Sequence, residues 1–557
     1  MKAALAFLVA LSLFLRFFYF PSHPSALYWD EMDVGYQAYS LLKTGKDYFN
    51  NPIPVHVHSF ADYRTPLYIY LTVPLVELFG LNPFSVRLTS ALMGLIGIAV
   101  LYVLSVLLLR LGKYSWLPAA VMALSPWHLH LSRIAFETTT LLALYLLGLA
   151  AFYRGFYRPR WFIISALGFG LSFWTYSPAK LFVPLTLLLL FIIYFRQIIL
   201  LPRHYIFNSL ILVFLLSFPI LYSSTFGPAS MRLRELLVFT DPVTSAEVDS
   251  KRQLVDLAAG FKRSIGMSPS LQARLVYNKL TFWGSAVLNN YVSSLSTEFL
   301  FVRGDPQPRH SPSETAYAQF HLIDLAPFLF GLFALFSLTY VTRPHSRLIV
   351  CLLLLAPLSS VITRDGGTHS LRLIFLLPVV SIVIALGLRR LIFSKILIVS
   401  YLSLFFVSLF LFSFYYFTSY RSESFRSFNF GYSQAVRYAL DNSQSYDRIF
   451  LDMYDQTALM AYMFEARPDP RRFQQSHPLQ SEEIMPGLDG LRMGNIYILP
   501  PGTRDWLKMD FSRLKGKNLV IADALLFEKA VHEGYLQTLF YPDSRLAFYI
   551  FTTPTSP

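Results

Sequence analysis

The chain has 557 residues, of which 54% are hydrophobic and only 14% are charged. A soluble globular protein carries about 25% charged residues, so this composition and the long apolar runs exclude that class and indicate an integral membrane protein. The net charge of +14 does not indicate a nucleic-acid surface. The basic residues stand in short clusters between apolar runs, and the chain from Tyr420 onward is nearly neutral. With Cys351 as the one cysteine, a disulfide within the chain and a cysteine metal site are both excluded.

Apolar runs that approach the roughly 20 residues needed to cross a bilayer recur along the chain. They predict about eleven transmembrane helices, near residues 3–20, 84–109, 115–131, 138–153, 161–178, 181–195, 205–224, 322–342, 347–363, 370–388 and 394–417. The run at 3–20 is too long for the apolar part of a typical signal peptide, so we interpret it as an uncleaved first span. Every second turn between spans is basic, which predicts a cytoplasmic N-terminus. An odd number of spans then places the C-terminal tail outside.

Three segments between or after the predicted spans are long enough to carry function. They are a first outer loop at 21–83, a large outer loop at 225–321 and the tail from residue 420. Residues 66–80 are apolar but form a short run that Pro74 interrupts, whereas residues 251–290 mix Lys and Arg with apolar side chains. Both segments are predicted to form helices that lie in the membrane interface. In the tail, short β-type runs at 448–452, 495–499, 518–522 and 547–551 alternate with helical spacing at 431–443 and 524–533.

The predicted fold class is therefore mainly α. Residues 1–419 form a polytopic membrane domain, and residues 420–557 form a small soluble α/β domain outside the membrane.

Carboxylates close to the predicted membrane edge are the first candidates for chemistry. Asp30, Glu31 and Asp33 follow the first span, and Glu137 lies in the turn between the third and fourth spans. Such a group can take or hold the proton of an acceptor hydroxyl or amine, and partial desolvation raises its pKa toward neutrality. An acidic turn that merely faces solvent is the alternative interpretation.

Cationic side chains on the predicted outer side run against the positive-inside rule. A phosphate leaving group needs such cations, so together with the carboxylates they predict an outer cavity for an anionic, lipid-linked substrate. The alternative for any one of them is an anchor that snorkels to the interface. The predicted phosphate-binding residues are Arg64, Arg133, Lys180, Arg364 and Arg372, and the predicted substrate-binding residues are Trp29, Asp62, Tyr63, Tyr176 and His369. Arg303-Gly304-Asp305 and Arg309-His310, late in the large loop, form a segment that could order a lid over the site.

Five segments, in this order and spacing, resemble the GT-C glycosyltransferases of family 39 and their relatives, the protein O-mannosyltransferases and the aminoarabinose transferases that modify lipid A. The segments are Trp29-Asp30-Glu31 and residues 64–68, 84–92, 132–137 and 175–178. The resemblance covers the chain to about residue 390. Arg64 stands where the family has lysine, Thr65 replaces one proline of a pair, and Glu137 replaces aspartate, so sugar and acceptor stay open.

The resemblance implies a polyprenyl-phosphate-sugar-dependent transferase, hexosyl or pentosyl, with Asp30 as its catalytic carboxylate. We expect transfer with inversion at the outer face of the plasma (inner) membrane, with Glu31 or Glu137 assisting Asp30. The expected partners are the polyprenyl-phosphate sugar, a glycan, lipid or protein acceptor, and membrane lipids, with no nucleic acid. The sequence assigns no cofactor, although Glu31 or Glu137 could hold a divalent cation.

Three other functions are compatible with the same sequence. A lipid-sugar flippase or transporter would need charges in the middle of spans and paired half-helices, whereas most charges here stand at span ends. An envelope polymerase or ligase that uses undecaprenyl-diphosphate oligosaccharide would place arginines in a late outer loop, which residues 364–372 partly fit. A non-catalytic receptor or scaffold would bind a lipid-linked sugar without turnover.

Overall fold

The computed structural model describes residues 2–60, 62–109, 111–260, 268–312, 317–337, 343–452, 457–475, 481–485, 488–499, 516–524, 535–542 and 544–552. The chain divides into two compact units. Unit 1 comprises Met1–Ser12, Gly94–His130 and Thr138–Phe410, and unit 2 comprises Leu13–Met93, Leu131–Glu137 and Leu411–Pro557. The helices that continue from one unit into the other include α1 (Lys2–Phe17), α4 (Pro83–Leu109) and α20 (Lys395–Phe417).

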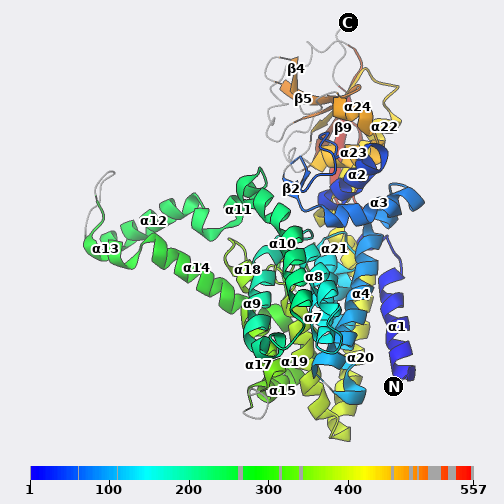
Figure 1. Ribbon diagram of the computed structural model, residues 1–557. Helices are drawn as coiled ribbons and strands as arrows, with labels where there is room; N and C mark the ends of the chain where they lie inside the picture. Colours follow the sequence, from blue (N-terminus) through cyan, green and yellow to red (C-terminus); the bar gives the residue numbers. More distant parts are fainter. Residues whose placement is uncertain are drawn as a thin grey trace. The chain divides into compact units, whose positions relative to one another are not determined.

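Among its described residues, the named secondary-structure elements of unit 1 are all helices (Figure 1). Its most extensive helix contacts join α7 to α8, α8 to α10 and α15 to α19. Its further helices are α5 (Leu117–Leu124), α6 (Pro126–Leu131), α7 (Thr138–Gly155), α8 (Trp161–Ser172), α9 (Ala179–Ile198), α10 (Arg203–Phe226), α11 (Ser230–Leu236), α12 (Val243–Ala258), α13 (Leu271–Val276), α14 (Lys279–Ser294), α15 (Leu325–Phe336), α17 (Pro344–Leu355), α18 (Leu358–Val361) and α19 (Leu376–Leu391).

Each of the eleven predicted spans overlaps at least one helix. Among the described residues, five helices are long and apolar enough to cross a membrane: Pro83–Leu109, Ala179–Ile198, Arg203–Phe226, Pro344–Val361 and Lys395–Phe417. The span predicted at 115–131 is divided into α5 and α6, because Ser125 adopts an extended backbone between them. A polytopic membrane protein is therefore confirmed, while the number eleven stays a prediction.

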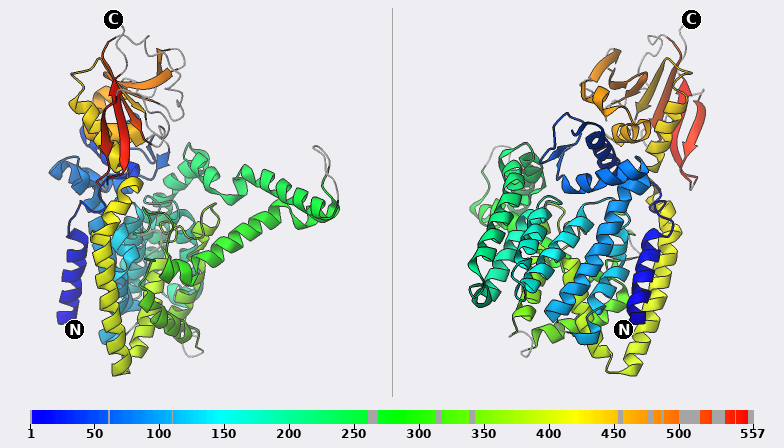
Figure 2. Two further views of the ribbon diagram at one scale, coloured as in Figure 1. Left: turned by 180° about the vertical axis from the view of Figure 1, so that it is seen from behind. Right: turned by 45° about the vertical axis from the view of Figure 1, so that its right-hand side comes forward.

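Helices α12, α13 and α14 of the large loop form an arm, which Figure 2 shows in green. Helix α12 contacts both α13 and α14. The predicted helical character of 251–290 is thus confirmed for the described part of that range. Its place in a membrane interface stays a prediction.

Unit 2 contains a mixed seven-stranded sheet in the order β4-β5-β6-β3-β7-β9-β8. The central strand β3 pairs in parallel with β6 and β7, and the outer pairings are antiparallel. The strands are β3 (Arg448–Asp452), β4 (Ser481–Met485), β5 (Leu488–Met493), β6 (Ile496–Ile498), β7 (Asn518–Asp523), β8 (Tyr535–Phe540) and β9 (Leu546–Thr552). The α/β character predicted for the tail is confirmed, and four of these strands match the predicted runs.

Short helices accompany this sheet in the sequence, and α22 packs on β3, β8 and β9. They are α21 (Ser419–Ser427), α22 (Phe430–Asp441), α23 (Thr457–Ala466) and α24 (Pro470–Gln475). Helix α22 confirms the helix predicted at 431–443. Residues 525–533 of the helix predicted at 524–533 lie outside the described residues.

The first loop contributes its own elements to unit 2. They are α2 (Trp29–Thr44), β1 (Val57–His58), β2 (Tyr63–Arg64) and α3 (Leu67–Phe79). Helix α3 confirms the helix predicted at 66–80, whereas the polar start of α2 concealed that helix from a search for apolar runs. The structure groups this loop with the tail, although the sequence placed a boundary between residues 419 and 420.

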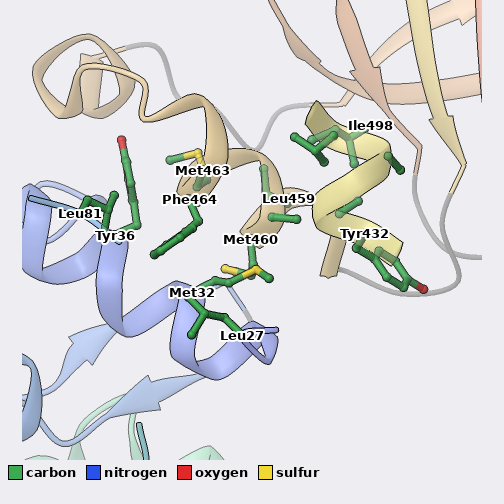
Figure 3. Close-up of a cluster of buried hydrophobic side chains, with 14 of the residues drawn as sticks. Leu27, Met32, Tyr36, Leu81, Tyr432, Leu459, Met460, Met463, Phe464 and Ile498 are labelled. Carbon is green, nitrogen blue, oxygen red and sulfur yellow. The ribbon is translucent and has the colours of Figure 1, made fainter. Parts of the chain in front are cut away.

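A shared hydrophobic core explains why the loop and the tail form one unit. Met32 and Tyr36 of α2 pack in the same buried cluster as Met460, Met463 and Phe464 of α23 (Figure 3). Helix α2 approaches α23 so closely at Gly35 that an added Cβ atom would lie 2.8 Å from the Phe464 ring. The small residue at this position is therefore a packing requirement.

Replacing Phe464 should loosen this core without touching a charged group. Truncation of a buried phenylalanine costs about 3–5 kcal/mol, so Phe464→Ala should lower the unfolding temperature of the purified protein. Phe540→Ala is the matched control, because Phe540 belongs to the same sheet unit but is 50% exposed. Equal melting temperatures for the two variants would show that the loop and the tail do not depend on this contact.

Candidate active site

Helix α2 carries Asp30, Glu31 and Asp33 in its first two turns and thereby fixes the directions of their side chains. It begins after Tyr28, whose backbone N–H donates to Glu31 Oε2 at 2.9 Å. Carboxylates in the first turn are favoured there by the positive end of the helix dipole. Residues three apart share a helix face, so Asp30 and Asp33 lie together while Met32 and Tyr36 take part in the core.

Arg64 brings Asp30 and Asp33 into one cluster. The antiparallel pair β1–β2 sets Arg64 opposite Val57. The Arg64 guanidinium forms an ion pair with Asp30 through Nη2, and another with Asp33 Oδ2 through Nε at 3.0 Å. The side chain of Asp30 is 19% exposed, against 7% for Arg64 and none for Asp33, so Asp30 is the most exposed member of the cluster.

Two aromatic side chains complete this acid–arginine cluster, which we define as Asp30, Asp33 and Arg64. The Arg64 guanidinium lies 5.4 Å from the centre of the Trp29 ring, within the range of a cation–π interaction. The Tyr48 hydroxyl donates to Asp33 Oδ1 at 2.5 Å. Burial raises the pKa of Asp33, although Arg64 and the bond from Tyr48 act in the opposite direction. The i, i+3 spacing from Asp30 was the sequence signal that could have assigned a role to Asp33.

Glu137 interacts electrostatically with the same cluster. The pKa of its carboxyl group is raised to about 7, mainly by burial and also by the charges of Asp30 and Asp33, against the lowering effect of Arg64. The Glu137 charge in turn helps Asp30 and Asp33 to raise the pKa of Arg64 against the effect of burial. A carboxyl group that titrates near neutral pH is suited to exchange a proton during catalysis.

Glu31 has a different environment from its neighbour Asp30. It is fully buried and pairs with Arg87, at 2.9 Å from Oε1 to Nε and 2.8 Å from Oε2 to Nη2. Its oxygens also accept the backbone N–H groups of Tyr28 and Ala135, the latter at 2.7 Å. A carboxylate with four such bonds is held in place, which favours a positioning role over proton transfer.

Arg133 is also fully buried, and its guanidinium holds the end of α1. It donates to the carbonyl oxygens of Leu15, Arg16 and Phe18 at 2.7–2.8 Å. These bonds satisfy carbonyl groups that a helix end otherwise leaves unpaired. The geometry favours an anchoring role for Arg133 over the phosphate contact that the sequence predicts.

The remaining predicted site residues of unit 2 are half-buried. Asp62 accepts the backbone N–H of Tyr63 at 2.6 Å, and the Tyr63 ring stacks on His58 with centroids 4.4 Å apart. These contacts shape the β1–β2 turn next to Arg64. Their predicted contact with substrate stays a prediction.

Five predicted site residues belong to unit 1. Lys180 donates to Ser224 Oγ at 2.7 Å, Arg372 donates to Thr363 Oγ1 at 2.7 Å, and the half-exposed Arg364 forms an ion pair with Asp241. Tyr176 is half-buried just before α9. The His369 ring stacks on that of His310, with centroids 4.5 Å apart. Burial lowers the pKa of His369 well below its ordinary value, and the nearby Arg372 adds to this effect.

Residues 63–222 match the family model described as dolichyl-phosphate-mannose-protein mannosyltransferase. The solved structure of ArnT from Cupriavidus metallidurans bound to undecaprenyl phosphate is similar over 99% of this chain and 98% of that one, with 12% identity and a TM-score of 0.51.

This chain has the GT-C glycosyltransferase fold. A second GT-C structure, the Archaeoglobus fulgidus oligosaccharyltransferase tethered to an acceptor peptide with the NVT sequon, is similar over 98% of this chain and 73% of that one. Its sequence identity is 10% and its TM-score 0.50. No curated protein matches the sequence. The resemblance expected from the first-loop and turn motifs is thereby confirmed, and the acid–arginine cluster lies in the first loop of a chain with this fold.

The contrast between Asp30 and Glu31 can be tested by stability. Glu31→Gln leaves the buried Arg87 without its counter-charge, which should lower the free energy of unfolding by about 3–5 kcal/mol. Asp30→Asn should lower the free energy of unfolding by less than about 1 kcal/mol, because Asp30 is partly exposed and Arg64 retains its ion pair with Asp33. Thermal unfolding in detergent measures both variants, and equal losses would contradict the assignment of Glu31 as the structural acid.

Glu137 should make stability depend on pH in a predictable direction. Its pKa of about 7 in the folded protein exceeds the ordinary value of 4.5, so folding favours the protonated form. The wild type should therefore lose stability as the pH rises from about 4.5 to 7, relative to Glu137→Gln, by at most about 3 kcal/mol. Unfolding temperatures of both proteins between pH 5 and about pH 8 measure this difference. Parallel curves would show that the Glu137 pKa is not raised.

Proposed function

We propose that this chain is a glycosyltransferase that moves a sugar from a polyprenyl-phosphate donor to a hydroxyl or amino group of a glycan, lipid or protein acceptor. The observation that carries the proposal is the acid–arginine cluster on the first loop of a GT-C fold. In it, a partly exposed carboxylate, Asp30, meets a buried guanidinium, Arg64, with Glu137 close enough to influence both.

The reaction needs one bond to form and one to break at the anomeric carbon. The acceptor oxygen or nitrogen attacks this carbon from the face opposite the phosphate, and the bond between the carbon and the phosphate oxygen breaks with inversion. Asp30 accepts or orients the acceptor proton, which is the task of a positioned carboxylate. Polyprenyl phosphate leaves with the electron pair of the broken bond. Because a phosphate monoester is a good leaving group, a strong general acid is not required.

Arg64 supplies charge for the leaving phosphate. A guanidinium binds phosphate oxygens through parallel N–H groups, and its effect is strongest in a site that excludes water. In the structure its partners are Asp30 and Asp33, so donor binding would exchange the Asp30 contact for a phosphate contact and release Asp30 toward the acceptor. We propose Glu137 as the assisting acid, since Glu31 is engaged by Arg87.

The cations of unit 1 remain proposed phosphate ligands. Lys180, Arg364 and Arg372 each contact a hydroxyl group or a carboxylate that a phosphate oxygen could replace. The class of donor is supported by the names of the similar proteins, because one description contains dolichyl phosphate and another undecaprenyl phosphate. The basic turns of the sequence support a reaction at the outer face of the plasma (inner) membrane.

A turnover assay with Asp30→Asn tests this proposal. Purified protein in detergent is incubated with a panel of polyprenyl-phosphate sugars, and release of polyprenyl phosphate is measured with and without candidate acceptors. We expect the wild type to use at least one donor and Asp30→Asn to lose at least about 100-fold in rate, as expected for a catalytic acid–base group. Asp441→Asn, at an exposed acid in α22 of the same unit, is the matched control and should keep full activity.

Two outcomes would overturn the proposal. The first is unchanged turnover in Asp30→Asn with normal folding. The second is tight donor binding without turnover for every donor and acceptor, which would favour a scaffold. Movement of a labelled donor across liposomes in the absence of transfer would instead favour the flippase.

A further inference from the structure

We propose that Asp305, His310 and His369 of unit 1 form a binding site for a divalent transition-metal ion, for which zinc is the best match. Each residue offers one ligand atom, and these atoms lie within 4.8 Å of one another. Among the described residues, this is the only group of three or more His, Cys, Asp or Glu side chains with that arrangement. The proposal stands apart from the glycosyltransfer chemistry assigned to Asp30.

The ligands come from two separate parts of the chain. Asp305 and His310 lie at the end of the large loop, after the π-helical turn Glu298–Val302, whereas His369 lies between α18 and α19. Two ligands close in sequence and one distant ligand are typical of metal sites that connect a loop to a scaffold. A bound ion would therefore fasten residues 305–310 to the turn that also carries Arg364 and Arg372.

The Asp305 carboxylate is already oriented by the backbone. Its Oδ2 accepts the N–H of Ser370 at 2.8 Å, and its Oδ1 accepts the N–H of Gln307 at 2.9 Å. The Ser370 hydroxyl donates to the His310 carbonyl oxygen at 2.9 Å, which joins the two segments a second time. Ligands that outer contacts hold in place before the ion arrives bind metal more tightly.

The two imidazole rings give the site its preference for a transition metal. His310 Nδ1 lies 3.0 Å from Asp305 Oδ2, and the His310 and His369 rings are nearly parallel, with an angle of 30° between them. His369 Nδ1 is buried and has no hydrogen-bond partner among the residues that the structure describes. A buried polar atom of that kind is costly, and an ion would satisfy it.

The chemistry of the ligands narrows the choice of ion. Two imidazole nitrogens and one carboxylate oxygen suit zinc, while calcium and magnesium prefer oxygen ligands alone. Three protein ligands leave a fourth tetrahedral position for water or for an anionic group. Arg372 supplies positive charge beside His369, which would favour an anion in that position.

The competing interpretation is a hydrogen-bonded Asp–His pair that holds the loop without any ion. The two interpretations differ in metal content and not only in stability. The full-length protein, purified in detergent, is stripped with a chelator and then titrated with zinc chloride in competition with a chromophoric chelator. We expect one zinc equivalent per chain and a higher unfolding temperature in its presence.

Variants separate the site from adventitious binding. His310→Ala and His369→Gln should each weaken zinc binding at least about 100-fold, and Asp305→Asn at least about 10-fold. His204→Ala, at an exposed histidine of α10, should leave the affinity unchanged. Circular dichroism checks that each variant is folded.

A spectroscopic measurement on the wild type keeps the test decisive if a variant fails to fold. Cobalt(II) added to the stripped protein should give the intense visible absorption of a tetrahedral site, and zinc should remove it. The proposal fails if the wild type takes up no zinc in this titration, or if His369→Gln binds zinc as tightly as the wild type. Loss of transferase activity alone would neither support nor contradict the proposed metal site.

Discussion

The buried ion pair between Glu31 and Arg87 organises the surroundings of the candidate active site. Arg87 donates to the carbonyl oxygens of Pro21 and Pro24 at 2.7 Å, so it also fixes the turn that leads from α1 to α2. Glu31 binds the backbone of Ala135, which fixes the turn that carries Glu137. One charge pair thus connects the start of α4, the start of α2 and residues 131–137. An ion pair buried this deeply gains little net stability, and its value lies in the geometry that it imposes.

The adjacent acids Asp30 and Glu31 have different surroundings. Successive residues of an α-helix point about 100° apart, so Asp30 and Glu31 necessarily face different surroundings. Glu31 turns toward the interior and is saturated by Arg87 and backbone groups, while Asp30 keeps some exposure and shares Arg64 with Asp33. Glu137, whose charge acts on Arg64, is the second acid of the proposed reaction.

The sequence predicted the class of fold because long apolar runs, basic turns and β-type runs are local signals. It predicted that Asp30, Arg64 and Glu137 lie on the same side of the membrane through the pattern of basic turns, and the order of the family motifs singled out Asp30. It could not separate Glu31 from Glu137, since the difference depends on Arg87, 56 residues away from Glu31. Nor could it show that Arg133 binds the end of α1, because a buried and an exposed arginine look alike in sequence. Helix α2 was missed for a similar reason, since its polar first turn hides the face that packs on α23.

The hydrophobic core shared by α2 and α23 has a practical consequence for handling the protein. Residues 420–557 look like a soluble domain that could be produced alone, yet their Met460, Met463 and Phe464 are covered by the first loop. A fragment of residues 420–557 would expose these side chains to water as an apolar patch that promotes association. Such a fragment would be expected to aggregate, and a short peptide spanning residues 27–44 would be the natural additive to keep it in solution.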